Sequence, residues 1–269
     1  MDLSIVVMGA SGRMGTTIAN LAQEQGLTLG AVLERPEKVP ALARWNCLAG
    51  SDPNLVFAEV PGAVVIDFTA PEASLATARI AAKYGNPMVI GTTGFTPAQR
   101  DELAELACTA RIFWSPNMSI GVNVLFELLP ELVKMLGSDY DLEMVEMHHN
   151  RKKDSPSGTA LRLAECLAQA RDWNLPDVAC YHREGIIGER PKDEIGIQAI
   201  RGGDVVGVHT VYFMGPGERI EVTHQAHSRE NFAQGALRAA RWIATQQPGK
   251  VYAMSDILKA GLSTPGQAQ

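Results

Sequence analysis

Residues 147–161, with the sequence MHHNRKKDSPSGTAL, combine two adjacent histidines, three cations and a helix-start pattern. An imidazole can accept or donate a proton near neutral pH, and Arg and Lys side chains attract anions. This local positive charge stands out because the whole chain carries a formal net charge of −6. The stretch therefore predicts a site that binds an anion and transfers protons.

The helix that follows this basic segment is expected to supply the anion-binding groups. Pro156 suits the first helical position, so Asp154 or Ser155 is expected to cap a helix that Pro156 opens. Residues Ser157–Thr159 would then present amide N–H groups and hydroxyls at the positive end of the helix dipole. Gly158 is a poor helix former, which indicates that something approaches the backbone closely. We predict a compact, doubly negative ligand here.

The two histidines lie at the end of a predicted strand, residues 141–149. Side chains alternate between the faces of a strand, so His148 and His149 point to opposite faces unless the strand ends there. At least one of them is expected to face the pocket. Taken alone, the segment could be a solvated basic loop. A zinc site formed with a distant cysteine has spacing unlike any ordinary metal motif, and we predict no metal site.

A glycine-rich segment near the N-terminus predicts a second binding function. Residues 9–15 read GASGRMG and lie between a β-branched run (3–9) and a helical pattern (13–26). This G-x-x-G-x-x-G spacing is a variant of the dinucleotide fingerprint, in which glycine lets a pyrophosphate approach the helix N-terminus. Glu34 follows about 20 residues later, where an acid binds a ribose hydroxyl. Glycines alone could serve packing only, but this context favours a nicotinamide dinucleotide.

Arg35 bears on which dinucleotide is bound. An acid at the end of the second strand repels a 2′-phosphate and favours NADH, whereas a neighbouring Arg can pair with that phosphate. Glu34 and Arg35 together therefore predict that both NADH and NADPH are accepted. The alternative is that Arg35 is only an exposed residue at a strand end.

Strand-like and helix-like segments alternate up to residue 117. The strand candidates are residues 3–9, 27–35, 62–69, 86–94 and 110–117. This alternation predicts the α/β class, with a Rossmann-type doubly wound parallel sheet. Residues 67–69, 91–94 and 115–118 end three of these strands, and ligands bind at that edge of a wound sheet. The three loops are therefore predicted to form the rim of the nucleotide site.

The pattern changes near residue 120. Three strand candidates separated by glycine-containing turns occupy residues 195–226, in addition to the 141–149 strand. They predict a second, α+β domain on an open mixed or antiparallel sheet. An amphipathic helix, residues 230–245, is expected to return to the first domain. We predict a dinucleotide-binding domain of residues 1–119 plus 230–269, and a second, substrate-binding domain of residues 120–229.

Composition limits the remaining function classes. The 269 residues are 46% hydrophobic and 20% charged, as in an ordinary globular protein. A pI near 5.6 argues against nucleic-acid binding, and no apolar run has the length of a membrane span. No signal peptide is recognised. The four cysteines form no C-x-x-C pair, which favours reduced thiols in the cytoplasm.

Several motifs together resemble one family. GASGRMG, ER after the second strand, DFTAPE, GTTG and HHNRKKDSPSGTA occur in this order, followed by RGGDVVG and GERIEVTH. From residue 3 to about residue 245 the chain resembles the 4-hydroxy-tetrahydrodipicolinate (dihydrodipicolinate) reductases of lysine and diaminopimelate biosynthesis. The resemblance implies that NAD(P)H delivers hydride to C4 of a cyclic dicarboxylate, the C4 hydroxyl leaves as water and a proton is added. It also implies a homotetramer joined through the second-domain sheets.

The resemblance further implies roles for individual residues. His148 matches the family's proton donor and acceptor, Lys152 its catalytic and substrate-contacting lysine, and His149 a substrate-binding histidine. Gly158 and Thr159 match residues that hold a substrate carboxylate, and Ser157 beside them is predicted to bind substrate too. The matched nucleotide contacts are Gly9, Ala10, Ser11, Gly12, Arg13, Met14, Glu34, Arg35, Gly91, Thr92, Thr93, Ser115, Pro116, Asn117 and Met118.

Three positions depart from the family pattern. Arg151 stands where many members have histidine, Lys153 where they have an apolar residue, and His227 where they have the first serine of T-H-x-A-S-S-R. The matched acid and base are retained, so these differences bear on pocket charge, pH optimum and cofactor preference. Two alternatives stay open: another NAD(P)-dependent amino-acid-type dehydrogenase, and a non-catalytic NAD(P)-sensing Rossmann protein.

Overall fold

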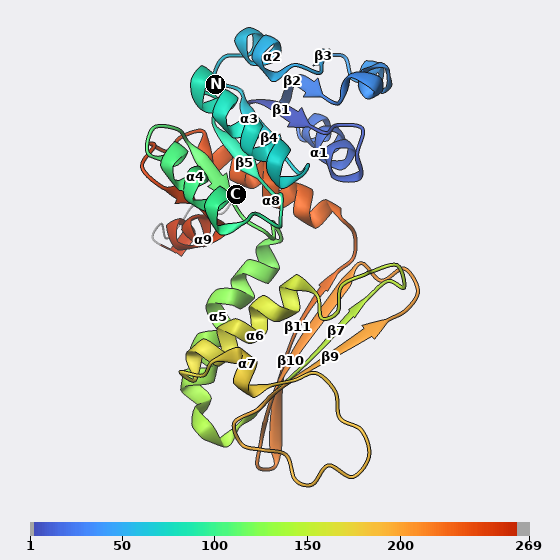
Figure 1. Cartoon of the computed structure of the whole chain (residues 1–269), viewed down its shortest axis with the longest axis vertical. Helices are drawn as coiled ribbons and strands as arrows, with labels where there is room; N and C mark the ends of the chain where they lie inside the picture. Colours follow the sequence, from blue (N-terminus) through green and yellow to red (C-terminus); the bar gives the residue numbers. More distant parts are fainter. Residues whose placement is uncertain (1–2, 263–269) are drawn as a thin grey trace. The chain divides into compact units, whose positions relative to one another are not determined.

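The computed structural model describes residues 3–262 and divides into two compact units (Figure 1). One unit contains the chain up to Ile120 and again from Arg229 onward, and the other is Gly121–Ser228. None of the helices between residues 3 and 262 combines the length and hydropathy that a membrane span requires.

The first unit is built on a seven-stranded sheet of order β12-β6-β5-β4-β1-β2-β3, and every neighbouring pair is parallel. The strands are β1 (Ser4–Met8), β2 (Thr28–Leu33), β3 (Leu48–Gly50), β4 (Val64–Asp67), β5 (Met88–Ile90), β6 (Ile112–Trp114) and β12 (Val251–Tyr252). The strand order reverses between β1 and β4, the topological switch point at which wound sheets bind ligands.

Helices cover both faces of this sheet, which confirms the predicted doubly wound α/β fold (Figure 1). They are α1 (Arg13–Glu24), the 3₁₀ helix η1 (Pro36–Arg44), α2 (Pro53–Glu59), α3 (Pro71–Tyr84), α4 (Pro97–Ala107), α8 (Glu230–Ile243) and α9 (Met254–Leu262). Successive strand residues serve opposite cores: Val7 and Ile66 pack with α1 and α8, whereas Val6 and Val65 pack with α3 and α4. Both faces are thus apolar, as expected for a parallel sheet.

The second unit has a mixed five-stranded sheet of order β11-β10-β7-β9-β8. Its elements are α5 (Ile120–Leu136), the 3₁₀ turn η2 (Gly137–Asp139), β7 (Asp141–His148), α6 (Gly158–Ala170), α7 (Leu175–Val178), β8 (Ala179–Cys180), β9 (Ile195–Arg201), β10 (Gly207–Gly215) and β11 (Glu218–Ala226). Strand β10 is antiparallel to both β7 and β11, whereas β7 and β8 run parallel to β9. The prediction of an open mixed sheet is confirmed.

One face of this sheet is buried under α5 and α6. Leu142 and Met144 of β7 pack there together with Val211 and Phe213 of β10. Because side chains alternate between the faces of a strand, Glu146 and His148 of β7 and His209 of β10 lie on the same face, and all three are buried. The covered face therefore changes from apolar to polar at the carboxyl end of β7.

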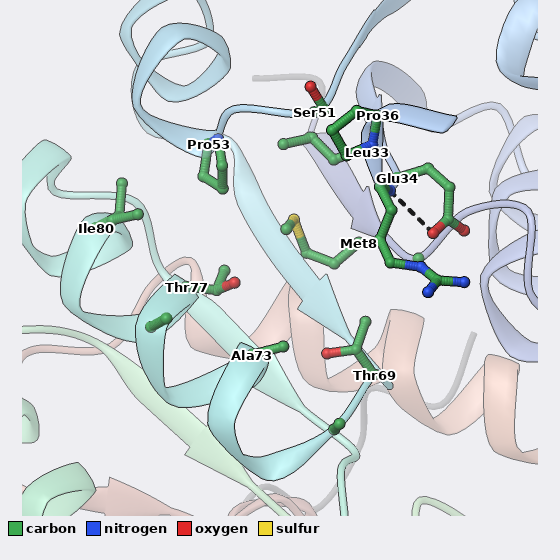
Figure 2. A pocket seen from close by; sticks show the side chains of 14 residues that line it. Met8, Leu33, Glu34, Pro36, Ser51, Pro53, Thr69, Ala73, Thr77 and Ile80 are labelled. Atoms are coloured by element: carbon green, nitrogen blue, oxygen red, sulfur yellow. Dashed lines mark hydrogen bonds between the residues drawn. The ribbon is translucent and has the colours of Figure 1, made fainter. Parts of the chain in front are cut away.

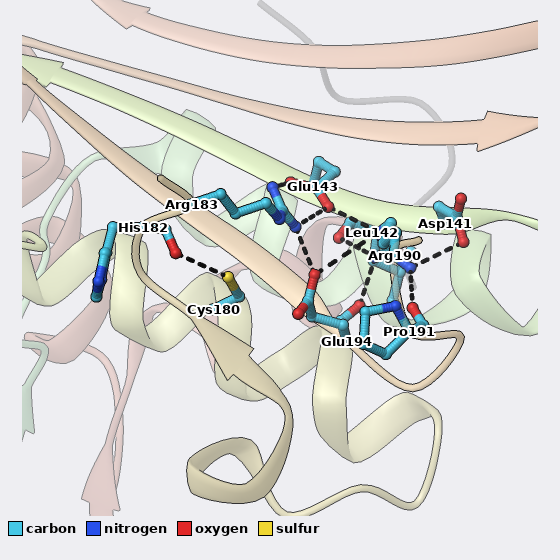
Figure 3. A network of polar contacts seen from close by, with 9 residues as sticks. All are labelled: Asp141, Leu142, Glu143, Cys180, His182, Arg183, Arg190, Pro191 and Glu194. Carbon is cyan, nitrogen blue, oxygen red and sulfur yellow. Dashed lines mark hydrogen bonds and ion pairs between the residues drawn. The ribbon is translucent and has the colours of Figure 1, made fainter. Parts of the chain in front are cut away.

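The other face of β7 holds a separate ion-pair network (Figure 3). The Glu143 carboxylate accepts hydrogen bonds from Arg183 at 2.7 Å and from Arg190 at 2.9 Å, and Arg183 also pairs with Glu194. A Cβ atom on Gly196 of β9 would lie only 1.8 Å from Glu143, so a larger residue there would have to displace this carboxylate from its arginine partners. These contacts tie the segment that joins β8 to β9 back onto the sheet.

Helix α8 crosses the 115–118 loop at close range within the first unit. A Cβ atom on Gly235 would lie 1.8 Å from the carbonyl oxygen of Met118, and the Met118 side chain is buried in the core beneath α1 and α8. Backbone carbonyls cannot move aside as a flexible side chain can. Gly235 therefore sets the distance at which α8 packs on this loop.

The substitution Gly235→Ala is expected to lower the free energy of unfolding by about 3 kcal/mol, because the added methyl group overlaps the Met118 carbonyl. Gly261→Ala, on α9 with open space around it, is the matched control, for which we expect no loss and a gain of up to about 1 kcal/mol. Urea unfolding followed by circular dichroism measures both. Equal unfolding midpoints for the two variants would contradict this packing argument.

Candidate active site and nucleotide pocket

His148 is the last residue of β7 and is 9% exposed. Its Nδ1 atom lies 2.6 Å from Oε2 of Glu146, which is completely buried. The alternation of strand residues predicted that at least one of the two histidines faces the pocket. The strand ends at His148, so His149 lies beyond the last regular strand position; it is half-buried and its N–H donates to the carbonyl of Val205.

Glu146 is the common partner of this region. Arg201 at the end of β9 donates two hydrogen bonds to it, at 2.6 and 2.8 Å, and the backbone N–H of Ser157 donates a third at 3.0 Å. Burial alone would raise the pKa of Glu146, but the hydrogen bonds from Arg201, His148 and Ser157 lower it on balance. A carboxylate is therefore present at neutral pH. Sequence analysis did not identify Glu146 or Arg201.

Two further groups enclose His148. Burial lowers the pKa of His148, and the Glu146 carboxylate opposes that shift without reversing it. The ring of His209 packs edge-on against the ring of His148, with centroids 5.2 Å apart. Burial lowers the pKa of His209 to about 4, so this second imidazole stays neutral, and its Nε2 atom lies 3.1 Å from the Ser157 hydroxyl.

Helix α6 begins at Gly158, and its N-cap is Ser157, whose hydroxyl accepts the N–H of Ala160 at 3.1 Å. The prediction that Asp154 or Ser155 caps a helix opened by Pro156 is wrong. Ser157 has extended backbone angles and therefore caps the helix without being part of it, and its N–H is bonded to Glu146. The Ser157 hydroxyl thus contacts both the first turn of α6 and His209.

The basic loop is anchored between β7 and α6. The ammonium group of Lys152 lies 2.9 Å from Asp154, and the Lys152 side chain is 20% exposed. Arg201 donates to the backbone carbonyl of Asp154 at 2.9 Å, so one guanidinium joins the loop to Glu146. Arg151 is exposed; its N–H donates to Nδ1 of His149 at 3.2 Å.

The groups predicted to bind an anion therefore lie on one side of the second unit. His148 and Ser157 both contact Glu146, and Lys152 lies in the loop that joins them. Gly158 is exposed, with no protein atom within 4 Å of the place of a Cβ, and Thr159 is half-buried in the first helical turn. The positive end of α6 can thus receive an anionic group at these two residues.

The glycine loop of the first unit forms a tight turn between β1 and α1. Gly9 has a φ of +62°, and a Cβ atom on Gly15 would lie 2.3 Å from the Gly9 carbonyl oxygen. Helix α1 starts at Arg13, and its N-cap, Gly12, provides no side-chain hydrogen bond. Only glycine fits this turn, and the bare helix start fits the pyrophosphate of a dinucleotide.

Glu34 reaches back from the end of β2 to this loop. The hydroxyl and the N–H of Ser11 donate to its Oε2 atom, at 2.5 and 3.2 Å. Burial alone would raise the pKa of Glu34, but these bonds and the N–H of Arg35 lower it on balance. The Arg35 side chain is exposed and lies 3.4 Å from Glu37.

A cavity of about 590 Å³ lies beside Glu34 (Figure 2). The predicted residues Gly9, Glu34 and Arg35 line it, so the structure brings these three together. Thr69, from the predicted 67–69 loop, also lines it. The other lining residues were not predicted, because they come from separate elements without a shared motif: Met8, Leu33, Pro36, Ser51, Pro53, Ala70, Ala73, Ala76, Thr77 and Ile80. A largely apolar wall beside a carboxylate suits an adenosine group.

The two later loops are organised by a buried aspartate, Asp67, at the end of β4. Its Oδ1 atom accepts the N–H and hydroxyl of Thr69 and the hydroxyls of Ser74 and Thr92. The Thr92 side chain is thus buried within the protein, whereas Thr93 is exposed. At Gly91 a Cβ atom would overlap the ring of Phe68, at 2.2 Å.

The 115–118 loop is likewise held by hydrogen bonds among its own and adjoining residues. The Ser115 hydroxyl donates to the carbonyl of Asn117 at 2.7 Å, and the Asn117 side chain accepts the N–H of Ser119. Pro116 is exposed and Met118 is buried. Among residues 3–262 there is no group of three or more His, Cys, Asp or Glu side chains arranged to hold a metal ion.

Comparison with known proteins identifies relatives along the whole chain. The family description "Dihydrodipicolinate reductase, N-terminus" matches residues 3–118, and "Dihydrodipicolinate reductase, C-terminus" matches residues 121–258. The 4-hydroxy-tetrahydrodipicolinate reductase of Nitratidesulfovibrio vulgaris strain DP4 is 74% identical over 258 residues, covering 96% of this chain and all of that protein. The protein of the same name from Lawsonia intracellularis is 62% identical over the same shares of the two chains.

Solved structures agree on the fold. A dipicolinate-bound dihydrodipicolinate reductase from Paenisporosarcina sp. TG-14 superimposes with a TM-score of 0.73 at 22% identity, covering 94% of this chain and 98% of that one. A probable dehydrogenase from Thermotoga maritima gives a TM-score of 0.59 at 14% identity, covering 94% and 92%. Both family descriptions and the near-full-length identities lead to one conclusion: this chain belongs to the dihydrodipicolinate reductase family.

Proposed function

We propose that this protein is the NAD(P)H-dependent reductase that converts 4-hydroxy-tetrahydrodipicolinate to tetrahydrodipicolinate in diaminopimelate and lysine biosynthesis. The observation that carries the proposal is the convergence of His148, Lys152 and the start of α6 at the end of β7, in a chain 74% identical to a reductase of that name. The second unit, predicted as residues 120–229, is the substrate-binding domain. The first, predicted as residues 1–119 plus 230–269, is the dinucleotide-binding domain.

The substrate is a dianion, and the second unit offers complementary groups for two carboxylates. Gly158 and Thr159, at the positive end of α6, bind one of them through the backbone, with Ser157 as the cap that fixes their orientation. Lys152 and His149 come from the adjoining basic loop and supply charge and a hydrogen bond to the rest of the ligand. Asp154 holds Lys152 in place until substrate competes for the ammonium group.

The reaction adds one hydride and one proton, and water leaves from C4. A bound nicotinamide supplies the hydride. His148 and Lys152 carry the protons: the lowered pKa of His148 leaves its imidazole neutral at rest, able to exchange a proton with the substrate or with Lys152. The buried position of His148 keeps bulk water away from that exchange.

We expect His148→Ala and Lys152→Ala each to reduce kcat by about 10²-fold or more, because each removes a proton-transfer group, while the Kd for NADPH stays unchanged. Lys153→Ala removes a neighbouring exposed cation and is expected to keep full turnover. The measurement is NADPH absorbance with enzymatically generated substrate, together with fluorescence titration of NADPH. Full turnover in both His148→Ala and Lys152→Ala would defeat the site assignment.

We propose that both NADH and NADPH serve as cofactor. Supporting this, the Glu34 carboxylate stands at the end of β2 beside the glycine loop, where it can accept the ribose 2′-hydroxyl of NADH. Arg35 is exposed next to it and can pair with the 2′-phosphate of NADPH. The remaining contacts proposed for the cofactor are Gly9, Ala10, Ser11, Gly12, Arg13, Met14, Gly91, Thr92, Thr93, Ser115, Pro116, Asn117 and Met118.

Substituting Arg35 separates the two cofactors. Arg35→Ala is expected to raise the Kd for NADPH about tenfold or more, since it removes a charge-assisted hydrogen bond, and to leave the Kd for NADH within about twofold. Lys38→Ala, which removes a nearby exposed cation on η1, controls for a general change of charge. Isothermal titration of each dinucleotide gives the constants. Equal weakening for NADH and NADPH would show that Arg35 does not read the 2′-phosphate.

We propose a homotetramer joined through the second-domain sheets. Supporting this, Met147, Ile200 and Val208 are direct neighbours across β7, β9 and β10, on the face opposite to His148, and Ile200 is 44% exposed. An apolar row on an uncovered sheet face is suited to pairing with another copy. All four cysteines, which lie within the described residues, are free thiols, in keeping with the proposed cytoplasmic location.

The substitution Ile200→Glu is expected to dissociate the tetramer, because it places a charge at the exposed β9 end of the apolar row, next to Met147. Leu128→Glu, at a similarly exposed apolar position on α5, is the matched control and is expected to leave the assembly intact. Light scattering coupled to size-exclusion chromatography measures the mass of each variant. An unchanged four-chain mass for Ile200→Glu would place the interface elsewhere.

A further inference from the structure

We propose that Glu146 is a positioning residue for His148: it holds the imidazole in the tautomer that carries its proton on Nδ1, so that Nε2 is the atom that exchanges a proton with substrate. This inference deepens the proposed function and rests on it for the catalytic part. The geometric part concerns only the second unit and can be tested without turnover.

The Glu146 carboxylate is fixed from three sides. Its Oε2 atom lies 2.6 Å from Nδ1 of His148 and accepts Nη1 of Arg201 at 2.8 Å. Its Oε1 atom accepts Nη2 of Arg201 at 2.6 Å and the N–H of Ser157 at 3.0 Å. These partners come from β7, β9 and the start of α6. The carboxylate therefore has one available orientation, and it presents an acceptor to His148.

An ionised carboxylate can only accept hydrogen bonds, so the hydrogen between Glu146 and His148 belongs to Nδ1. A neutral His148 then has its lone pair on Nε2. The space beside that atom is kept open by Gly207 of β10, where a Cβ atom would lie 3.0 Å from Nε2. Glycine at this position leaves the reactive side of the ring accessible.

The charges around His148 show why the carboxylate matters when the ring becomes protonated. Lys152 in the basic loop and Arg201 on β9 both oppose an imidazolium, and neutral His209 on β10 supplies no negative charge. Glu146 is the anion that acts against them, since Asp154 lies in an ion pair with Lys152. Without Glu146, burial and the two cations would lower the pKa of His148 further.

The substitution Glu146→Gln tests this because an amide cannot reproduce the arrangement. Both oxygens of Glu146 accept N–H donors, so the amide of Gln has two possible orientations. In the first, its NH₂ group takes the place of Oε1 and faces donors of Arg201 and Ser157. In the second, the NH₂ group takes the place of Oε2 and donates to Nδ1 of His148. In the second case the ring proton moves to Nε2. In either case the negative charge that stabilises the imidazolium is lost, so the pKa of His148 falls.

A second glutamate on β7, Glu143, provides a matched control. Glu143 also accepts hydrogen bonds from two arginines, Arg183 and Arg190, but on the opposite face of β7 (Figure 3). Glu143→Gln therefore removes a comparable Glu–Arg network without touching His148. It separates the loss of an ion-pair network from the loss of the His148 partner.

The first experiment uses the unaltered enzyme. In protein carrying ¹⁵N-labelled histidine, with His148→Gln supplying the assignment, we expect the neutral His148 ring to carry its proton on Nδ1 and to have an unprotonated Nε2. A proton on Nε2 in the neutral ring overturns the proposal. This measurement requires neither substrate nor a folded Glu146 variant. It therefore determines the tautomer of His148 even if Glu146→Gln does not fold.

The second experiment compares turnover as a function of pH. Glu146→Gln is expected to lower kcat by about 10- to 100-fold, and to move the pH limb assigned to His148 toward acid, because the carboxylate that favours the imidazolium is gone. Glu143→Gln is expected to keep both the wild-type kcat and the wild-type pH limb. Equal losses in the two variants with an unmoved pH limb would reduce Glu146 to a structural role and overturn the proposal.

The reductase site and the positioning role of Glu146 can each be disproved without the other. If His148→Ala and Lys152→Ala retain turnover while the ring proton is on Nδ1, the proposed function of the site fails and the Glu146–His148 geometry stands. If those variants lose turnover and the ring proton is on Nε2, the reductase site stands and the positioning role is overturned.

Discussion

The burial of one ionised carboxylate organises the second unit. Moving a carboxylate out of water costs several kcal/mol, so a fully buried Glu146 is compatible with a stable fold only if its oxygens are paired. Arg201 supplies a two-point ion pair and Ser157 an amide, and together they tie β9 and the start of α6 to β7. The position of α6, and hence of its anion-binding end, follows from satisfying this one side chain.

The alternation of β7 explains why that side chain lies where it does. Leu142 and Met144 build the core against α5 and α6, and the same face reaches Glu146 and His148 two and four residues later. The intervening position, Val145, faces the other way, as does Glu143 with its own pair of arginines. A single strand thereby serves a core, a polar site and an opposite, partly exposed face without a change of conformation.

Long, strongly patterned segments were predictable from the sequence, whereas the short ones were not. Runs such as 3–9 and 62–69 are β-branched and bounded by glycine, and they form β1 and β4. The edge strands β3 and β12 have three and two residues, too few to show a period. The start of α6 was misplaced because capping preferences allow several nearby residues, and the choice depended on a tertiary partner of Ser157.

The site itself was predicted as far as local motifs reach. His148, Lys152 and the Ser157–Thr159 turn are contiguous enough to be recognised together, and so is the glycine loop with Glu34. Glu146 was missed because a glutamate in an alternating strand normally indicates the solvated face. The signal was present nonetheless: Glu146 has the same parity as Leu142, Met144 and His148. Reading that parity as buried would have required knowing which face α6 covers.

A second buried carboxylate, on Asp67, shows how Arg201 keeps Glu146 charged. Asp67 of β4 is as deeply buried as Glu146 and accepts four hydrogen bonds on Oδ1, but all of them come from hydroxyls and one amide. Within the described residues its Oδ2 atom has no hydrogen-bond partner, and burial raises its pKa despite those bonds. Burial thus disfavours the charged form of Asp67, which holds two loops together through hydroxyl and amide donors alone. Glu146, paired with Arg201, keeps its charge, and a charged partner stabilises an imidazolium more strongly than a neutral acceptor does.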